Sequence, residues 1–241
     1  VIPAALAVAE SVGNVSGKEF ITALALGSDI VSRLGLALKE DPIKHGWYMP
    51  PILGAFGAAT AACKLLNLGP EQILDAFSLT LCQATCSAEL TQSPHSVVRA
   101  IRDAFSAKAG VLSAQLAARG VTGFEQPFEG KAGLFQLYSR GNYDPSVLTN
   151  GLGEIFEGAN VSFKPWPSCR GTHPFIEATL HILNTHDIKP ADIEGIKLFL
   201  SPSPINRVLC EPLETKRSPR TAIDAKFSIP FTVALASVQR G

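Results

Sequence analysis

Residues 52–67 read ILGAFGAATAACKLLN, a run in which Gly and Ala alternate with large apolar side chains. The run lies between Pro50-Pro51 and Gly69-Pro70 and contains no internal proline, so it predicts a helix over residues 52–67. Small side chains allow a neighbouring backbone to approach closely. We therefore expect this helix to be buried at the centre of a helical bundle.

Helical patterns continue on both sides of this run. Ser16 and Glu19 have the spacing of a capping box, which predicts a helix beginning at residue 17. Further helices are predicted over residues 70–87, 96–119 and 172–184. Residues 193–200 alternate apolar and polar side chains and favour a strand. The sequence therefore predicts a mainly α fold, with a helical domain up to about residue 160 and a smaller α+β segment after it.

The charge of the chain excludes some classes of partner. The 241 residues include 21 Lys and Arg against 21 Asp and Glu, so the formal net charge is zero. Proteins that bind nucleic acid or anionic membranes carry clustered basic residues, and we predict neither partner here. Charged residues make up only 17% of the chain. Buried interfaces are depleted in charge, so this low fraction predicts a sizeable subunit or domain interface.

Three further features bear on the class of protein. The longest strongly apolar stretches, such as residues 51–63, fall short of the roughly 20 residues of a membrane span, so none is predicted. The chain opens with Val1 and holds a single Met, Met49, so we expect it to lack its native N-terminus. The five cysteines are scattered and form no CxxC pair, which is typical of a reducing compartment and predicts a cytoplasmic protein without a metal site.

Three segments concentrate side chains that could carry chemistry. The loop over residues 44–51, KHGWYMPP, holds polar aromatic residues and is either a functional loop or a connection plugged by Trp47. Arg99 and Arg102 follow Ser93-Pro94-His95 at the start of a predicted helix, where the helix dipole does not favour cations. An anionic ligand is one explanation for these arginines, and ordinary solvation is the other.

The third segment is residues 164–173, KPWPSCRGTH, directly before a predicted helix. It brings together two cations, Lys164 and Arg170, with the thiol of Cys169 and the imidazole of His173. The first turn of a helix also offers unpaired backbone N–H groups. This segment is therefore suited to binding a carboxylate.

Four runs of sequence resemble the MmgE/PrpD family, whose members include 2-methylcitrate dehydratase, cis-aconitate decarboxylase and iminodisuccinate epimerase. The runs are GWYMPPILGAFGAATAACKLLNLGPEQILDAF (46–77), GVLSAQLAARGVTGFEQPFEG (110–130), KPWPSCRGTHPFIEA (164–178) and AIDAKFSIPF (222–231). The resemblance implies a homodimer whose subunit has an all-α domain, built from both ends of the polypeptide, and a smaller inserted α/β lid domain. On this basis residues 1–160 belong to the helical domain, 161–217 to the lid, and 218–241 to the return into the helical domain, with part of the N- and C-terminal helical segments missing.

The resemblance also implies roles for individual residues. Arg99 occupies a position where the family usually has Lys, and Lys164 occupies the position of the lysine at the entry to the lid. Cys169 takes the place of the family's His or Cys after the proline, and His173 matches a further common His. Tyr48 stands where a His often follows the loop glycine and aromatic residue.

The function implied is a cofactor-independent enzyme that acts on a small di- or tricarboxylate. Arg99, Lys164 and Arg170 are expected to bind carboxylates, because Arg offers a planar fork of donors and Lys a point charge. His173 or Tyr48 is expected to transfer a proton, with Cys169 as a polar lining group. A dehydratase like 2-methylcitrate dehydratase is the first expectation, with a decarboxylase or an epimerase also open. The alternative is a non-catalytic relative that binds a polycarboxylate or serves as a dimeric scaffold.

Overall fold

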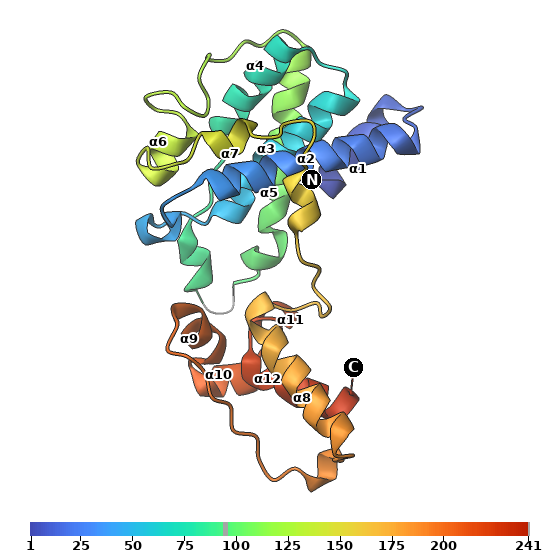
Figure 1. The fold of residues 1–241 in the computed structure, drawn as a ribbon, viewed down its shortest axis with the longest axis vertical. Coiled ribbons are helices and arrows are strands. Elements are labelled where there is room, and N and C mark those ends of the chain that lie inside the picture. The colour runs from blue at the N-terminus through green and yellow to red at the C-terminus, as the bar shows by residue number, and fades with distance from the viewer. Residues whose placement is uncertain (94–95, 241) are drawn as a thin grey trace. The chain divides into compact units, whose positions relative to one another are not determined.

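The computed structural model describes residues 1–93 and 96–240, and these are mainly α-helical (Figure 1). The longer helices are α1 (Ile2–Val12), α2 (Gly17–Ala37), α3 (Met49–Leu65), α4 (Pro70–Leu81), α5 (Val98–Ala118), α8 (His173–Thr185) and α12 (Ile229–Gln239). The short α-helices are α6 (Leu134–Ser139), α7 (Ser146–Thr149), α9 (Pro204–Cys210), α10 (Leu213–Arg217) and α11 (Ala222–Ala225). The 3-10 helices are η1 (Pro42–His45), η2 (Ala88–Thr91), η3 (Glu157–Asn160), η4 (Arg170–Thr172) and η5 (Pro190–Asp192). The mainly α prediction is confirmed.

The chain divides into two compact units. Unit 1 consists of residues 1–89 and 101–161, and unit 2 of residues 90–93, 96–100 and 162–240. Helix α5 therefore begins in unit 2 and continues in unit 1. Arg99, which we expected on the helical domain, belongs to unit 2, as do residues 218–240.

Helix α3 is the central element of unit 1. Of its 17 residues, 13 are buried, and it packs against α1, α2 and α4. Its small residues explain the close packing, since a Cβ at Gly57 would lie 2.6 Å from the carbonyl oxygen of Gly27 on α2. A Cβ at Gly110 of α5 would likewise lie 2.5 Å from the carbonyl oxygen of Ala55. The helix predicted over residues 52–67 is thus buried in a bundle, as expected.

The predicted start of α2 is confirmed, whereas the predicted end of α4 is wrong. The capping box forms at α2, where the Ser16 hydroxyl accepts from the Glu19 N–H at 3.2 Å and the Glu19 carboxylate accepts from the Ser16 N–H at 2.8 Å. The helix predicted to reach residue 87, in contrast, ends at Leu81. The backbone N–H of Tyr48 instead donates to the carbonyl of Cys86 at 2.9 Å, so the segment after α4 pairs with the loop before α3.

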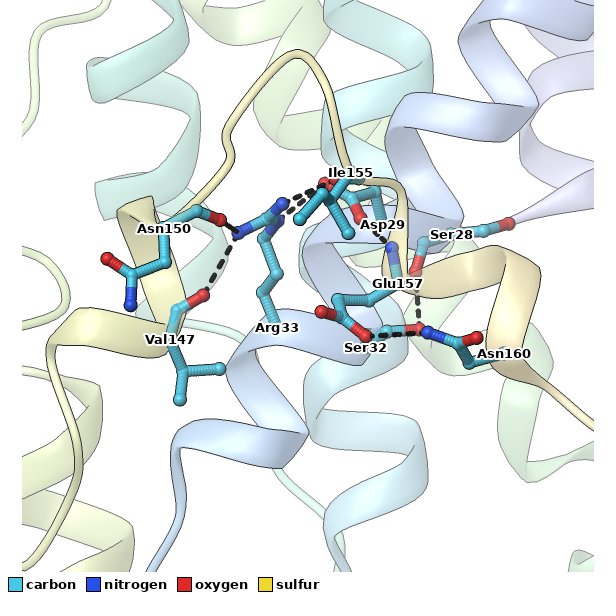
Figure 2. A network of polar contacts seen from close by, with 9 residues as sticks. All are labelled: Ser28, Asp29, Ser32, Arg33, Val147, Asn150, Ile155, Glu157 and Asn160. Atoms are coloured by element: carbon cyan, nitrogen blue, oxygen red, sulfur yellow. Dashed lines mark hydrogen bonds and ion pairs between the residues drawn. The ribbon is translucent and has the colours of Figure 1, made fainter.

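Helix α2 is long and apolar enough to cross a membrane by length and composition alone, although the sequence analysis predicted no span. It carries a buried ion pair, in which Arg33 Nε donates to Asp29 Oδ2 at 2.7 Å. Arg33 Nη1 donates to the carbonyls of Val147 and Asn150, and Nη2 donates to that of Ile155, as Figure 2 shows. This ion pair connects α2 to the segment over residues 147–155 of the same unit.

Unit 2 packs α8 against α12, and its small core contains Leu209, Ile229 and Val233. The strand predicted over residues 193–200 is wrong: these residues have no regular hydrogen-bonded structure, and the described residues contain only two isolated β-bridges, both in unit 1. A strand requires a partner backbone for its N–H and C=O groups, and alternation of side chains does not supply one. The α/β character expected for this region is not observed.

Candidate functional site

A cavity of about 570 Å³ lies within unit 2. Its described lining comes from residues 91–93, the first turn of α5, the end of α9, α10, α11 and the turn that follows α11. Its volume is in the range of pockets that hold small molecules. The lining residues are Thr91, Gln92, Ser93, Arg99, Arg207, Val208, Glu211, Pro212, Thr215, Lys216, Asp224 and Phe227.

Phe227 joins the groups around this cavity. The guanidinium carbon of Arg99 lies 3.7 Å from the centre of the Phe227 ring, a cation–π contact that holds the guanidinium plane in place. Lys216 Nζ donates to the Phe227 carbonyl at 2.8 Å. One residue earlier, the carbonyl of Lys226 accepts from the backbone N–H of Cys169 at 2.8 Å. These contacts connect three segments that are far apart in the sequence.

The charges lining the cavity are unevenly balanced. Arg99, Arg207 and Lys216 face Glu211 and Asp224. Arg207 Nε lies 3.5 Å from Glu211 Oε2, and both side chains are exposed, so this pair is a weak contact at the rim. Burial lowers the pKa of Lys216, and the neighbouring charge of Arg99 lowers it further, whereas Asp224 raises it. Among the described lining residues three cations thus face two carboxylates, and an anion bound between Arg99 and Lys216 would reduce the repulsion between them.

The structure gathers most of the predicted site residues in unit 2, but it places only Arg99 in the lining of this cavity. Lys164 is exposed, and its Nζ donates to the carbonyl of Ser168 at 3.1 Å. Arg170 is exposed on η4. Cys169 is half-buried and lies close enough to Lys216 to influence its pKa.

His173 is the first residue of α8 and is buried, with 8% of its surface exposed. Its ring meets Trp166 edge-on, with the ring centres 5.5 Å apart. Among the described residues, its buried Nε2 has no hydrogen-bond partner. A buried imidazole nitrogen is usually paired, so this one is a candidate for contact with a ligand or for proton transfer.

Tyr48 lies in unit 1, at the N-terminus of α3. The guanidinium carbon of Arg102 lies 4.7 Å from the centre of its ring. A second cavity, of about 730 Å³, is lined by Tyr48 together with Trp47, two residues of α2 (Val31 and Gly35) and residues of the segments 38–43 and 49–53. Arg99 and Arg102, at the start of α5, therefore each lie over an aromatic ring. Contact with an aromatic ring was not among the explanations considered from the sequence, which were an anionic ligand and solvation. His95 and Pro94, in the same segment, lie outside the described residues.

The loop before Tyr48 is held by a histidine between two charged side chains. His45 Nε2 lies 2.9 Å from Glu40 Oε1, and His45 Nδ1 lies 3.0 Å from Arg140 Nη2. A guanidinium can only donate, so Nδ1 must accept and Nε2 must carry the proton.

We expect ¹⁵N NMR at mildly alkaline pH to show neutral His45 as the Nε2–H tautomer. The His45 resonances are assigned as those that disappear in the His45→Gln variant. The exposed His181 provides the reference, and a protonated Nδ1 on a neutral His45 would contradict this arrangement.

Lys216, Asp224 and Phe227 were not identified from the sequence as site residues. Phe227 and Asp224 lie within the run over residues 222–231, one of the four runs that resemble the family. That run was the sequence feature from which these two site residues could have been found. Lys216 lies in the last turn of a five-residue helix, and nothing local distinguishes it from a surface lysine. Among the described residues, no group of three or more His, Cys, Asp or Glu could hold a metal ion.

Two protein-family models match the chain. The model of the MmgE/PrpD N-terminal domain matches residues 1–146, and the model of the MmgE/PrpD C-terminal domain matches residues 166–241. Together they cover most of the sequence in the order expected from the resemblance.

Similar curated proteins were also found. The cis-aconitate decarboxylase-like protein oryM of Aspergillus oryzae is 32% identical over 73% of this chain and 39% of its own length. Cis-aconitate decarboxylase of Aspergillus terreus is 25% identical over the whole of this chain and 51% of its own length. Cis-aconitate decarboxylase of Homo sapiens is 26% identical over 80% of this chain and 41% of its own length. The chain spans about half the length, or less, of the relatives it matches.

Proposed function

Because the chain belongs to the MmgE/PrpD family, we propose that the whole protein is an enzyme acting on a small di- or tricarboxylate, with Arg99 as a carboxylate-binding residue. The observation that carries this proposal is the cavity of unit 2, where Arg99 is held against Phe227 beside the second cation Lys216. A guanidinium binds carboxylates through parallel hydrogen bonds. Lys164 and Tyr48 remain candidates from the resemblance, and Arg170 remains one from its place in the segment over residues 164–173.

Decarboxylation is the first candidate reaction, since the three relatives described above are named for it. In this reaction the bond between carbon and the departing carboxylate breaks, its electron pair stays on the substrate carbon, and a proton is then added there. Arg99, bound to a neighbouring carboxylate, would stabilise the developing negative charge. His173, a match to a common histidine of the family, is the proposed proton donor: its buried Nε2 has no partner among the described residues, and it lies in unit 2 outside the lining of this cavity. The proposal includes no metal or organic cofactor.

Dehydration, which the resemblance favoured, is the second candidate reaction and presents the same need to stabilise charge beside a carboxylate. Assays of the full-length protein with cis-aconitate, 2-methylcitrate and iminodisuccinate distinguish the family's reactions by CO₂ release, alkene formation and epimer ratio. We expect turnover of one of the three, and the absence of turnover with all of them would contradict the enzyme proposal. The alternative of a non-catalytic binder predicts thermal stabilisation by citrate without turnover.

We also propose that the protein is a cytoplasmic homodimer joined mainly through unit 1. Helices α1 and α2 pack on each other and expose Ile2, Leu6 and Ile21, whose exposed fractions are 62%, 50% and 66%. Exposed apolar side chains on adjacent helices favour an interface. All five cysteines are free thiols, which suits a reducing compartment.

For the dimer, we expect light scattering on the full-length protein to give twice the subunit mass. The variant Leu6→Glu should shift the protein towards monomer, because it places a charge in a desolvated interface. Ile182→Glu, at a similarly exposed position of unit 2, is the matched control and should leave the mass unchanged. A wild-type protein that is monomeric at all concentrations would contradict the assignment.

A further inference from the structure

We propose that Lys216 is a second carboxylate-binding residue and that, with Arg99, it makes the cavity of unit 2 selective for ligands carrying two carboxylates over ligands carrying one. This inference rests on the proposed function, because it concerns the same cavity. Lys216 and Arg99 are 117 positions apart in the sequence, and both line the cavity. Neither the family match nor the resemblance assigns a role to Lys216.

The fold fixes the position of Lys216 through its backbone. The N–H of Lys216 donates to the carbonyl of Pro212 at 3.0 Å, within the turn of α10. Its carbonyl accepts from the hydroxyl of Ser228 at 2.5 Å, and that hydroxyl also caps α12 by accepting from Phe231 N–H at 3.0 Å. Ser228 is fully buried. The lysine backbone is therefore anchored to the start of a longer helix.

The side chain of Lys216 keeps donors for a ligand. An ammonium has three N–H donors, and one of them binds the Phe227 carbonyl at 2.8 Å. The same residue, Phe227, supports the Arg99 guanidinium through its ring at 3.7 Å. Two cations are thus held on opposite parts of one residue, the backbone carbonyl and the ring, so their separation is set by the structure.

The charge balance favours an anion with more than one negative group. Arg207 and Glu211 pair with each other at the rim, and the other charged residues of the lining that the structure describes are Arg99, Lys216 and Asp224. Asp224 is held by the Thr221 hydroxyl, which donates to its Oδ2 at 2.7 Å. A monocarboxylate can satisfy one of the two cations, whereas a dicarboxylate can bind both.

The test compares two ligands of four carbons, succinate with two carboxylates and butyrate with one, by calorimetry on the full-length protein. We expect succinate to bind at least tenfold more tightly than butyrate to the wild type. Lys216→Gln should weaken succinate binding about tenfold and leave butyrate binding unchanged, since it removes one charge-assisted contact. Lys216→Arg should retain the preference. Lys189→Gln removes an exposed lysine of the same unit that does not line the cavity, and should change neither affinity.

A pH series provides a second readout. Lys216 is charged only below its pKa, which is lowered by burial and by Arg99, so succinate binding to the wild type should weaken as pH rises through this lowered range. Lys216→Arg stays charged and should lose less affinity over the same range. Among the described residues, the other groups that act on the pKa of Lys216 are Asp224, Cys169 and Cys210, each of which raises it. They are present in both proteins, so the difference between the two pH profiles reports on residue 216.

The outcomes separate this inference from the proposed function. Equal binding of succinate and butyrate, or unchanged succinate binding in a Lys216→Gln variant that keeps the wild-type circular dichroism, would overturn the role of Lys216. No measurable binding of succinate to the wild type would overturn it as well. Selective binding of succinate without turnover of any family substrate would support the two-cation site while contradicting the enzyme proposal.

Discussion

Replacing Arg33 by methionine is expected to destabilise unit 1 by about 3–5 kcal/mol, because it leaves a buried carboxylate without its counter-ion. Arg33 is 1% exposed and Asp29 is 6% exposed. Besides binding Asp29, the guanidinium donates to the carbonyls of Val147, Asn150 and Ile155 at 3.0, 2.9 and 2.6 Å. These three carbonyls would lose their partner together with the carboxylate.

The same ion pair fixes the segment that leaves unit 1. Asp29 Oδ1 accepts from the backbone N–H of Glu157 at 2.6 Å, at the start of η3 (Figure 2). Arg33 and Asp29 therefore hold both ends of the segment over residues 147–157 on one turn of α2. The loss of stability should be accompanied by faster hydrogen exchange in this segment, because its contacts to α2 are removed.

Each unit contains one tryptophan, so its unfolding can be followed separately. Trp47 packs edge-on against Tyr138 in the core of unit 1, whereas Trp166 belongs to unit 2. In a variant that retains Trp47 as its sole tryptophan, urea unfolding followed by Trp47 fluorescence measures the stability of unit 1. Arg119→Met, an exposed arginine of the same unit, should change it by no more than about 0.5 kcal/mol.

A double variant identifies the cause of the loss. Asp29→Asn in the Arg33→Met background removes the uncompensated charge and should recover part of the free energy of unfolding. The rest should stay lost, because the three carbonyls still lack a hydrogen-bond donor. An Arg33→Met protein as stable as the wild type would show that the ion pair contributes nothing net to unit 1.

The sequence could predict the elements whose causes are local. The capping box at Ser16 depends on neighbours within one helix, and the run of small residues between Pro51 and Gly69 indicates a closely packed helix without identifying its partners; the structure contains both features. The strand over residues 193–200 fails because strand formation depends on a partner backbone, which side-chain alternation cannot reveal. Arg33 went unnoticed for a related reason, since its carbonyl partners lie 114 to 122 positions away.

In the candidate site, too, a residue with a local sequence signal was predicted and a residue that depends on tertiary contacts was not. Arg99 was identified because a cation at the start of a helix required an explanation, and the structure supplies one in the ring of Phe227. Lys216 lies in the last turn of a short helix, a common place for a surface lysine, and only its contact with Phe227 makes it part of the cavity. A residue whose role depends on tertiary contacts, such as Lys216, cannot be identified from the sequence immediately around it.

Replacing Arg99 by glutamine is expected to weaken polycarboxylate binding by about 10- to 100-fold, which corresponds to the roughly 1.5–3 kcal/mol of a hydrogen bond to a charged group. The substitution removes both the positive charge and the planar fork that lies 3.7 Å from the centre of the Phe227 ring. Arg99→Lys keeps the charge but not the fork, so its affinity should fall between those of the wild type and Arg99→Gln. Calorimetry with citrate on the full-length protein measures all three.

Arg220→Gln provides the matched control for Arg99, because it removes an exposed arginine of unit 2 that does not line the cavity. Its citrate affinity should equal that of the wild type. If the protein turns over a family substrate, Arg99→Gln should lower kcat/KM at least as much as it lowers affinity, since negative charge develops beside the bound carboxylate in the transition state. An Arg99→Gln protein that binds citrate as tightly as the wild type would place carboxylate recognition elsewhere. The exposed cations Lys164 and Arg170, which precede α8, would then be the next residues to replace.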